Sequence, residues 1–179
     1  MSNQLKIIVV SDNHGDYQSL AKVLNDNQDA DHVFHCGDSM FPADDELMRD
    51  LIKVRGNSDF HIEGYPMTVT YELANGQKVF MAHGNRHDRY HAENTVLTQA
   101  AIDVAATFAF YGHTHFAEIT TENGVIVINP GSTCAPRSYS GRPLAAPSYA
   151  KLMISETGCN VKLLTVVDNT VVKEKDFEF

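Results

Sequence analysis

The chain has 179 residues, of which 43% are hydrophobic and 21% are charged, a composition typical of a folded globular protein and unlike that of a disordered one. Acidic residues outnumber lysine and arginine by 23 to 14. The formal net charge of −9 argues against non-specific electrostatic binding to nucleic acid or anionic lipid. The length predicts a single domain over residues 1–179.

The cysteine and histidine content indicates which kinds of site this chain can form. Three widely spaced cysteines without a CxxC pair support neither a disulfide framework nor a zinc ribbon. Nine histidines are an unusual number, and they are the first indication of a metal site. Only four apolar residues, Ile7 to Val10, follow the polar start, which is too few for a signal peptide, and the chain has no apolar run long enough to span a membrane. We therefore expect a cytoplasmic protein without membrane association.

The first half of the chain predicts alternating strands and helices. Residues 6–11 form an apolar, β-branched run that predicts a strand, and apolar residues then recur at helical spacing over residues 17–24. Residues 32–36 and 51–54 predict two further short strands, and residues 43–50 predict a short acidic helix between them.

The second half predicts mainly hairpins. Residues 67–82 contain an alternating strand, the turn dipeptide Asn75-Gly76 and a returning strand. An apolar stripe predicts a helix over residues 96–105. The remaining strands are expected over residues 108–111, 118–122, 125–128, 148–155, 159–167 and 170–175. A βα-like first half followed by hairpins favours an α+β sandwich over a doubly wound nucleotide-binding fold.

Seven polar residues share one position, just past the C-terminal end of a predicted strand. In layered α/β architectures these ends gather at one edge of the sheet, where ligands bind. Their oxygen and nitrogen donors suit Mn, Fe, Zn, Ni or Mg. With only two carboxylates, a pair of metal ions would have to share one, and a shared aspartate holds two cations about 3.5–4 Å apart. The seven residues are Asp12, His14, Asp38, Asn57, His83, His113 and His115.

The order of these motifs resembles that of the calcineurin-like metallophosphoesterase superfamily. The motifs SDNHG, HCGDS, GNSD, AHG, GHTH and NPGS resemble its small single-domain bacterial and archaeal branch of phosphodiesterases, over about residues 6–137. The resemblance implies a four-layer αββα sandwich, in which two mixed β-sheets are flanked by helices, with a centre for two divalent metal ions. Mn²⁺ is the first choice, and Ni²⁺, Fe²⁺, Zn²⁺ and Mg²⁺ are alternatives.

The resemblance also implies how the ligands divide. One metal would be held by Asp12, His14, Asp38 and His115, and the other by Asp38, Asn57, His83 and His113, with Asp38 bridging the two. We expect Asp38, Asn57 and His83 to be catalytic as well as metal-binding. A hydroxide activated by the two metals would attack phosphorus in line with the leaving oxygen.

The residues around the proposed metal ligands suggest substrate contacts. Many relatives carry a histidine after the Gly-Asn motif, where this chain has Ser58, so a candidate general acid is absent. Ser58, Arg86 and Arg137 are candidate contacts for a small phosphodiester substrate. For Arg86 and Arg137 a solvated surface position is the alternative interpretation.

Two other functions stay open. A relative of this fold in the retromer complex is a protein-interaction subunit with a degraded metal site, but all seven ligand positions are intact in this chain. A nuclease or a phosphomonoesterase of the same superfamily is the other alternative. The chain has no basic stripe and no spare length for the extra segments that larger members carry, which disfavours a stable nucleic acid partner. The sequence leaves homo-oligomerisation open.

Overall fold

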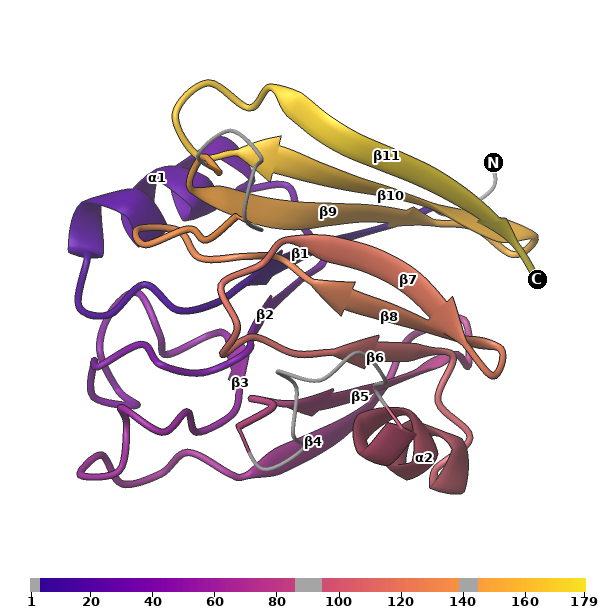
Figure 1. The fold of residues 1–179 in the computed structure, drawn as a ribbon, viewed down its shortest axis with the longest axis horizontal. Coiled ribbons are helices and arrows are strands. Elements are labelled where there is room, and N and C mark those ends of the chain that lie inside the picture. The colour runs from indigo at the N-terminus through magenta and orange to yellow at the C-terminus, as the bar shows by residue number, and fades with distance from the viewer. Residues whose placement is uncertain (1–3, 86–94, 139–144) are drawn as a thin grey trace.

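Two β-sheets packed face to face form the centre of the protein (Figure 1). The computed structural model describes residues 4–85, 95–138 and 145–179. Within them, the first sheet has the strand order β11-β10-β9-β1-β2-β3, parallel between β1, β2 and β3 and antiparallel elsewhere. Its strands are β1 (Leu5–Val10), β2 (His32–His35), β3 (Ile52–Lys53), β9 (Ser148–Ile154), β10 (Gly158–Thr165) and β11 (Val171–Glu178).

The second sheet has the strand order β4-β5-β6-β8-β7, with a parallel centre and an antiparallel strand at each edge. Its strands are β4 (Thr68–Glu72), β5 (Lys78–Ala82), β6 (Phe108–Phe110), β7 (Glu118–Glu122) and β8 (Val125–Asn129). Both sheets are therefore mixed, as expected from the sequence.

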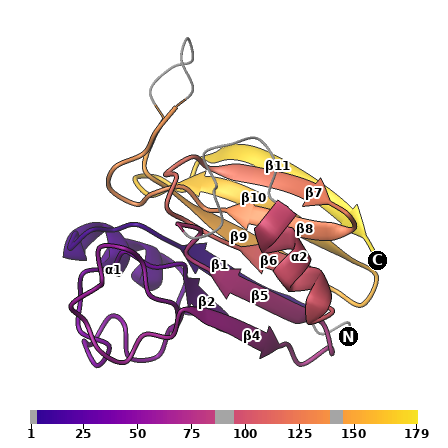
Figure 2. The same ribbon diagram turned by 60° about the horizontal axis from the view of Figure 1, so that its bottom comes forward.

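One helix covers the outer face of each sheet (Figure 2). Helix α1 (Tyr17–Asp26) begins at Asp16, whose carboxylate accepts a hydrogen bond from the backbone N–H of Ser19, and it packs Leu20 and Val23 against the first sheet. Helix α2 (Thr95–Asp103) packs on the second sheet. The α+β sandwich with four layers is thus confirmed. Neither helix is long and apolar enough to cross a membrane, and no other helix is found in the described residues.

Strand β1 shows why its sequence is continuously apolar rather than alternating. Ile7 and Val9 belong to the core between the two sheets, whereas Ile8 and Val10 pack under α1. All four side chains are fully buried because both faces of the strand are covered.

The acidic helix expected over residues 43–50 is wrong, because this segment forms turns. The carboxylate of Asp45 accepts a hydrogen bond from the backbone N–H of Leu47, and the Asp45 carbonyl accepts from Met48 and Arg49. An aspartate that bonds locally to the backbone competes with helical hydrogen bonding. The buried Met48 side chain nevertheless anchors these turns in the same layer as α1.

Candidate metal centre

The residues directly after β1, β2, β3, β5 and β6 lie together at one end of the sandwich, opposite the chain termini (Figure 1). Backbone hydrogen bonds join these segments. The N–H of Asp12 donates to the carbonyl of Gly37, and the N–H of His14 donates to that of Asp38, both over 3.0 Å. The N–H of Gly112 donates to the carbonyl of His83, also over 3.0 Å. The two sheets therefore deliver their strand ends to one site.

Five of the seven predicted ligands have left-handed backbone conformations. Their φ angles are 55° at Asp12, 42° at His14, 56° at Asp38, 66° at His113 and 62° at His115. Such conformations cost about 1–3 kcal/mol each at non-glycine residues and gather at functional sites. The surrounding hydrogen bonds thus hold these five residues in backbone conformations that are unfavourable for non-glycine residues.

Two glycines make room for the aspartate carboxylates. A Cβ atom at Gly56 would lie 2.0 Å from Asp38 Oδ1, and one at Gly112 would lie 2.5 Å from Asp12 Oδ2. Any larger residue at these two positions would displace a carboxylate, which is why the motifs read Gly-Asn and Gly-His.

The first candidate ligand group consists of Asp12, His14 and His115. The Nε2 atoms of His14 and His115 are 3.2 Å apart, and Asp12 Oδ1 lies 3.3 Å from His115 Nε2 and 3.8 Å from His14 Nε2. Nδ1 of His115 donates to the carbonyl of Ala135, which leaves the Nε2 lone pair directed at the group.

The second candidate group consists of Asp12, Asp38 and His83. His83 Nε2 lies 3.4 Å from Asp38 Oδ2 and 3.1 Å from Asn57 Oδ1, and His83 Nδ1 donates to the carbonyl of Cys36 over 2.8 Å. Asp38 Oδ2 is also 3.8 Å from His14 Nε2. The Asp38 carboxylate therefore lies between ligands of both groups, although Asp12 is the residue that the two groups share.

These donors fit a divalent cation. Asp12 is fully buried, and its Oδ1 atom has no hydrogen-bond partner among the described residues. An unpartnered buried carboxylate oxygen is costly unless a cation compensates it. Carboxylate oxygens, imidazole nitrogens and one amide oxygen are the donor set of first-row divalent metals.

The ionisation of the site also favours bound positive charge. Burial raises the pKa of Asp38, but hydrogen bonds from His83 and Ser58 outweigh it and bring the pKa down to about 2. The nearby Asp12 carboxylate, 3.3 Å from Nε2, raises the pKa of His115. Burial lowers the pKa of His83, but its interaction with Asp38 prevails and the pKa is raised. Burial also raises the pKa of Asp12, but the neighbouring histidines outweigh it and lower the pKa, so both carboxylates are anionic and attract a proton or a metal cation to the site.

His113 completes the predicted set. Its ring lies across that of His83, with centroids 5.2 Å apart, and its backbone N–H donates to Asp12 Oδ2 over 3.0 Å. Burial lowers the pKa of His113, so its ring is neutral and able to bind a metal. All seven predicted ligands therefore lie in one region, at the strand ends from which the sequence placed them.

The three predicted substrate contacts have different outcomes. Ser58 lies in the site, where its N–H donates to Asp38 Oδ1 over 2.7 Å and its hydroxyl donates to Asp38 Oδ2 over 3.0 Å. Arg137 is exposed, but its backbone N–H donates to the carbonyl of His115, and its charge partly opposes the rise in the pKa of that histidine. Arg86 lies outside the described residues.

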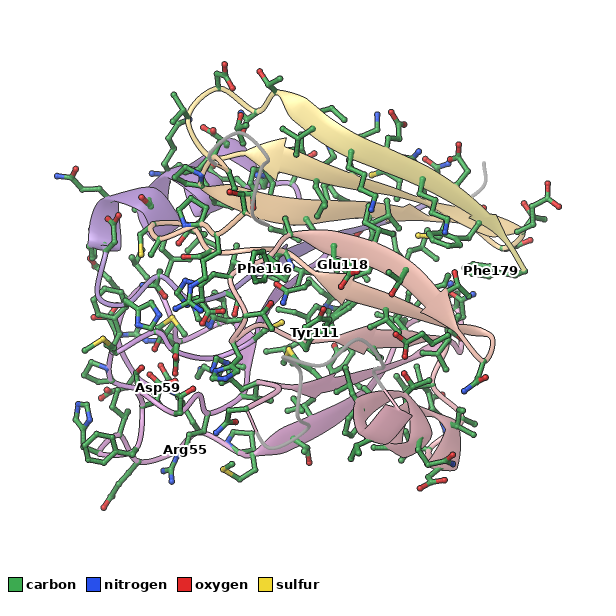
Figure 3. The ribbon with its side chains drawn as sticks, in the orientation of Figure 1. Arg55, Asp59, Tyr111, Phe116, Glu118 and Phe179 are labelled. Atoms are coloured by element: carbon green, nitrogen blue, oxygen red, sulfur yellow. The ribbon has the colours of Figure 1, made fainter. Side chains whose placement is uncertain are left out.

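Several residues that support the site were not predicted as functional from the sequence. Asp59 lies at the loop end of the molecule, as Figure 3 shows, and its buried carboxylate accepts three backbone N–H bonds. Asn129 donates to the carbonyl of Gly112 and to Thr114 Oγ1, and Ser132 donates to the carbonyl of Asp12. The motifs GNSD and NPGS contain these three residues, which is the signal that could have identified them.

Comparison with known proteins agrees with this geometry. Residues 5–156 match the family described as the calcineurin-like phosphoesterase superfamily domain. The probable metallophosphoesterase YsnB of Bacillus subtilis is 26% identical over 170 residues, which cover 93% of this chain and 95% of that protein. A predicted phosphoesterase from Streptococcus pneumoniae has a crystal structure with a TM-score of 0.87 and 31% identity, and the two chains cover each other fully. A Vps29 structure from Entamoeba histolytica, at 23% identity, has a TM-score of 0.73 and covers 98% of this chain and 99% of its own.

Proposed function

Because the chain belongs to the calcineurin-like phosphoesterase superfamily, we propose that it is a metal-dependent phosphodiesterase that acts on a small phosphodiester. The family and the candidate site support a metallophosphoesterase, and the preference for diesters is the finer proposal. The observation that carries it is the buried Asp12 Oδ1, which has no hydrogen-bond partner in the described part of the chain and belongs to two overlapping groups of aspartate and histidine. A net charge of −9 favours a small substrate over nucleic acid.

The proposed ligands are those that the family resemblance implies. Two divalent cations, with Mn²⁺ as the first choice, would supply Lewis-acid polarisation of a phosphoryl oxygen and activation of water. One would be held by Asp12, His14, Asp38 and His115, and the other by Asp38, Asn57, His83 and His113.

The chain's own residues orient this site. The carbonyls of Cys36 and Ala135 fix the rings of His83 and His115 by accepting from their Nδ1 atoms. Hydrogen bonds from Ser58 fix the Asp38 carboxylate. Pre-organised groups of this kind need no rearrangement during the reaction, which is the main electrostatic contribution that an enzyme can make.

Ser58 supports the preference for diesters. Its hydroxyl is engaged with Asp38, and a serine is too weak an acid to protonate a leaving oxygen near neutral pH. The site therefore favours leaving groups that depart without a proton. A monoester dianion also brings more negative charge to the carboxylates of Asp12 and Asp38 than a diester monoanion does.

A protein-interaction scaffold is the second candidate, because the fold of Vps29 matches along the whole chain. A scaffold does not require an intact ligand set, whereas this chain keeps both candidate ligand groups. We therefore place catalysis first, and metal-dependent turnover separates the two candidates.

The test is hydrolysis of bis(p-nitrophenyl) phosphate by the purified protein, with elemental analysis of bound metal. Activity should disappear with chelator and return with Mn²⁺. His115→Gln should lower kcat/KM at least about 100-fold. The matched control is His32→Gln, because His32 lies at the start of β2 and contacts Tyr71 instead of the site. Full activity after confirmed removal of metal, or equal activity of the two variants, would contradict the proposal.

A further inference from the structure

A groove lies beside the candidate metal centre, between the loop that follows β2 and the loop that follows β3. It encloses about 660 Å³, within the range of small-molecule sites. We call it the side groove, and its lining residues are Met40, Pro42, Ala43, Asp44, His61, Ile62, Glu63 and Gly64.

The side groove is joined to the metal centre through Asp59. One carboxylate oxygen of Asp59 accepts from the N–H of Asp38, and the other accepts from the N–H of Met40, each over 2.8 Å. Met40 thus lies two residues from a proposed bridging ligand on one wall, and His61 lies two residues from Asp59 on the other. The side groove and the metal centre are therefore neighbours along both loops.

The two walls are fastened together behind the groove. Tyr65 donates to the carbonyl of Phe41 over 2.8 Å and lies 3.0 Å from the hydroxyl of Ser39. Burial raises the pKa of Tyr65 to about 12, so this phenol remains a neutral donor. The groove is therefore formed before any ligand arrives, which reduces the entropy cost of binding.

The lining combines carbon surface with negative charge. Met40 is 44% exposed and contributes a flexible thioether, and Pro42 and Ala43 add aliphatic surface. Asp44 and Glu63 are exposed, and neither carboxylate has a hydrogen-bond or ion-pair partner among the described residues. Among the described residues, none that lines the groove is lysine or arginine, and the Arg55 guanidinium behind it is engaged with the carbonyl of Ile62 over 2.6 Å. A second phosphate or a carboxylate in this groove would meet repulsion.

We propose that the side groove binds one organic arm of the phosphodiester substrate and selects a carbon-rich arm with a positive charge over a neutral or anionic arm. This inference rests on the proposed function. The class of substrate is then a phosphodiester of an amino or quaternary ammonium alcohol. Carbon surface contacts the arm, and Asp44 and Glu63 face its charge.

The experiment compares p-nitrophenyl esters that share one leaving group and differ only in the second arm. The choline ester carries a cationic arm, and the 3,3-dimethylbutyl ester is its uncharged isostere. We expect the choline ester to have a kcat/KM about 5–10-fold higher, because exposed ion pairs contribute up to about 1 kcal/mol each. Asp44→Asn combined with Glu63→Gln should reduce this preference to about 2-fold or less.

Two controls make the test specific. Asp103→Asn combined with Glu156→Gln removes the same two charges from α2 and from the β9–β10 turn, and should keep the preference. Ala43→Phe fills the side groove and should raise KM about 10-fold for the choline ester, while the methyl p-nitrophenyl ester is unaffected.

The outcomes separate the two hypotheses. Metal-dependent hydrolysis of bis(p-nitrophenyl) phosphate with no preference for the choline ester, or a preference that the groove variants leave unchanged, overturns the side-groove inference and leaves the proposed function standing. A thymidine ester preferred over the choline ester also overturns it, in favour of a nucleoside arm. No hydrolysis of any ester overturns the proposed function, and this inference with it.

Discussion

The buried carboxylate of Asp59 accepts a hydrogen bond from the backbone N–H of Asp38 over 2.8 Å and thereby fixes the loop that carries the proposed bridging ligand. The same carboxylate accepts from the N–H groups of Met40 and Gly56, over 2.8 and 2.9 Å. One side chain therefore fixes the loops after β2 and β3 relative to each other.

Replacing Asp59 should damage both stability and metal affinity. Asp59→Asn keeps the size but puts an amide donor where three backbone donors converge. We expect the free energy of unfolding to fall by about 1–3 kcal/mol, and metal affinity to fall about 10–100-fold. Chemical denaturation and metal titration measure the two effects. Asp44→Asn is the matched control, because that carboxylate is exposed and has no partner in the part of the chain that the structure describes. Equal stability and equal metal binding in both variants would show that Asp59 does not position the ligand loop.

Asp38 should be the most sensitive position for metal content. Its Oδ2 atom lies 3.4 Å from His83 Nε2 and 3.8 Å from His14 Nε2, between the two groups. Asp38→Asn should lower the affinity for both metals, because a neutral amide cannot offset two cations. His14→Ala should weaken one site alone. Elemental analysis after dialysis against limiting Mn²⁺ should give fewer than one metal per chain for the first variant and about one for the second.

One experimental outcome would contradict the assignment of Asp38 as the bridging ligand. Asp12 belongs to both candidate ligand groups, so it is the competing candidate for the shared carboxylate. Two bound metals and undiminished activity in Asp38→Asn, together with loss of both metals in Asp12→Asn, would transfer the bridging role to Asp12.

His35 should make the protein sensitive to mild acid. Its ring is fully buried, Nε2 donates to Asn13 Oδ1 over 2.8 Å, and Nδ1 accepts from the N–H of Gly37 over 3.1 Å. Burial lowers the pKa of His35 from 6.5 to about 4. The unfolded chain therefore binds an extra proton below pH 6.5, and stability falls from there until the folded ring also protonates near pH 4.

The measurement is the free energy of unfolding of the parent and of His35→Gln from pH 7.5 to pH 4. Glutamine has no titrating group, so the parent should lose about 3 kcal/mol more than the variant across this range. Subtracting the two curves removes the contributions of the other histidines. A constant difference between the curves would show that His35 does not titrate as its burial requires.

Much of the fold and of the candidate site could be predicted from the sequence, because both depend on local patterns. The β-branched runs of β1 and β8 predict strands, and the turn dipeptides Asn75-Gly76 and Asn123-Gly124 mark two hairpins. Polar residues follow the C-terminal ends of the parallel strands. They converge, because parallel strands place these ends at the same edge of a sheet.

What the sequence did not predict depends on long-range contacts. Residues 43–50 have a helical pattern, but the Asp45 side chain bonds to the Leu47 backbone and turns prevail. The importance of Asp59 comes from backbone donors that lie up to 21 residues earlier in the chain. The side groove likewise requires the contact between Tyr65 and Phe41, which no local pattern indicates.

The last prediction concerns Ser58 and the choice between mono- and diesters. A histidine at this position could donate a proton to the leaving oxygen, a contribution typically worth about 10²–10⁴-fold. The parent should therefore prefer aryl diesters to aryl monoesters. Ser58→His should raise the ratio of monoester to diester kcat/KM by about 10-fold or more, because a cationic imidazole also offsets the additional charge of a monoester.

Ser58→Ala separates this effect from the loss of the hydrogen bond between the Ser58 hydroxyl and Asp38 Oδ2. The backbone N–H of residue 58 still donates to Asp38 Oδ1 in both variants, so the carboxylate keeps one of its two hydrogen bonds from this residue. Alanine should lower both activities together and leave their ratio unchanged, whereas histidine should change the ratio. Both variants are assayed with saturating Mn²⁺ and with metal content checked, so that a displaced metal is not mistaken for a changed preference. If the parent already prefers the monoester, or if Ser58→His and Ser58→Ala give the same ratio with both metals bound, the absent acid does not determine the specificity.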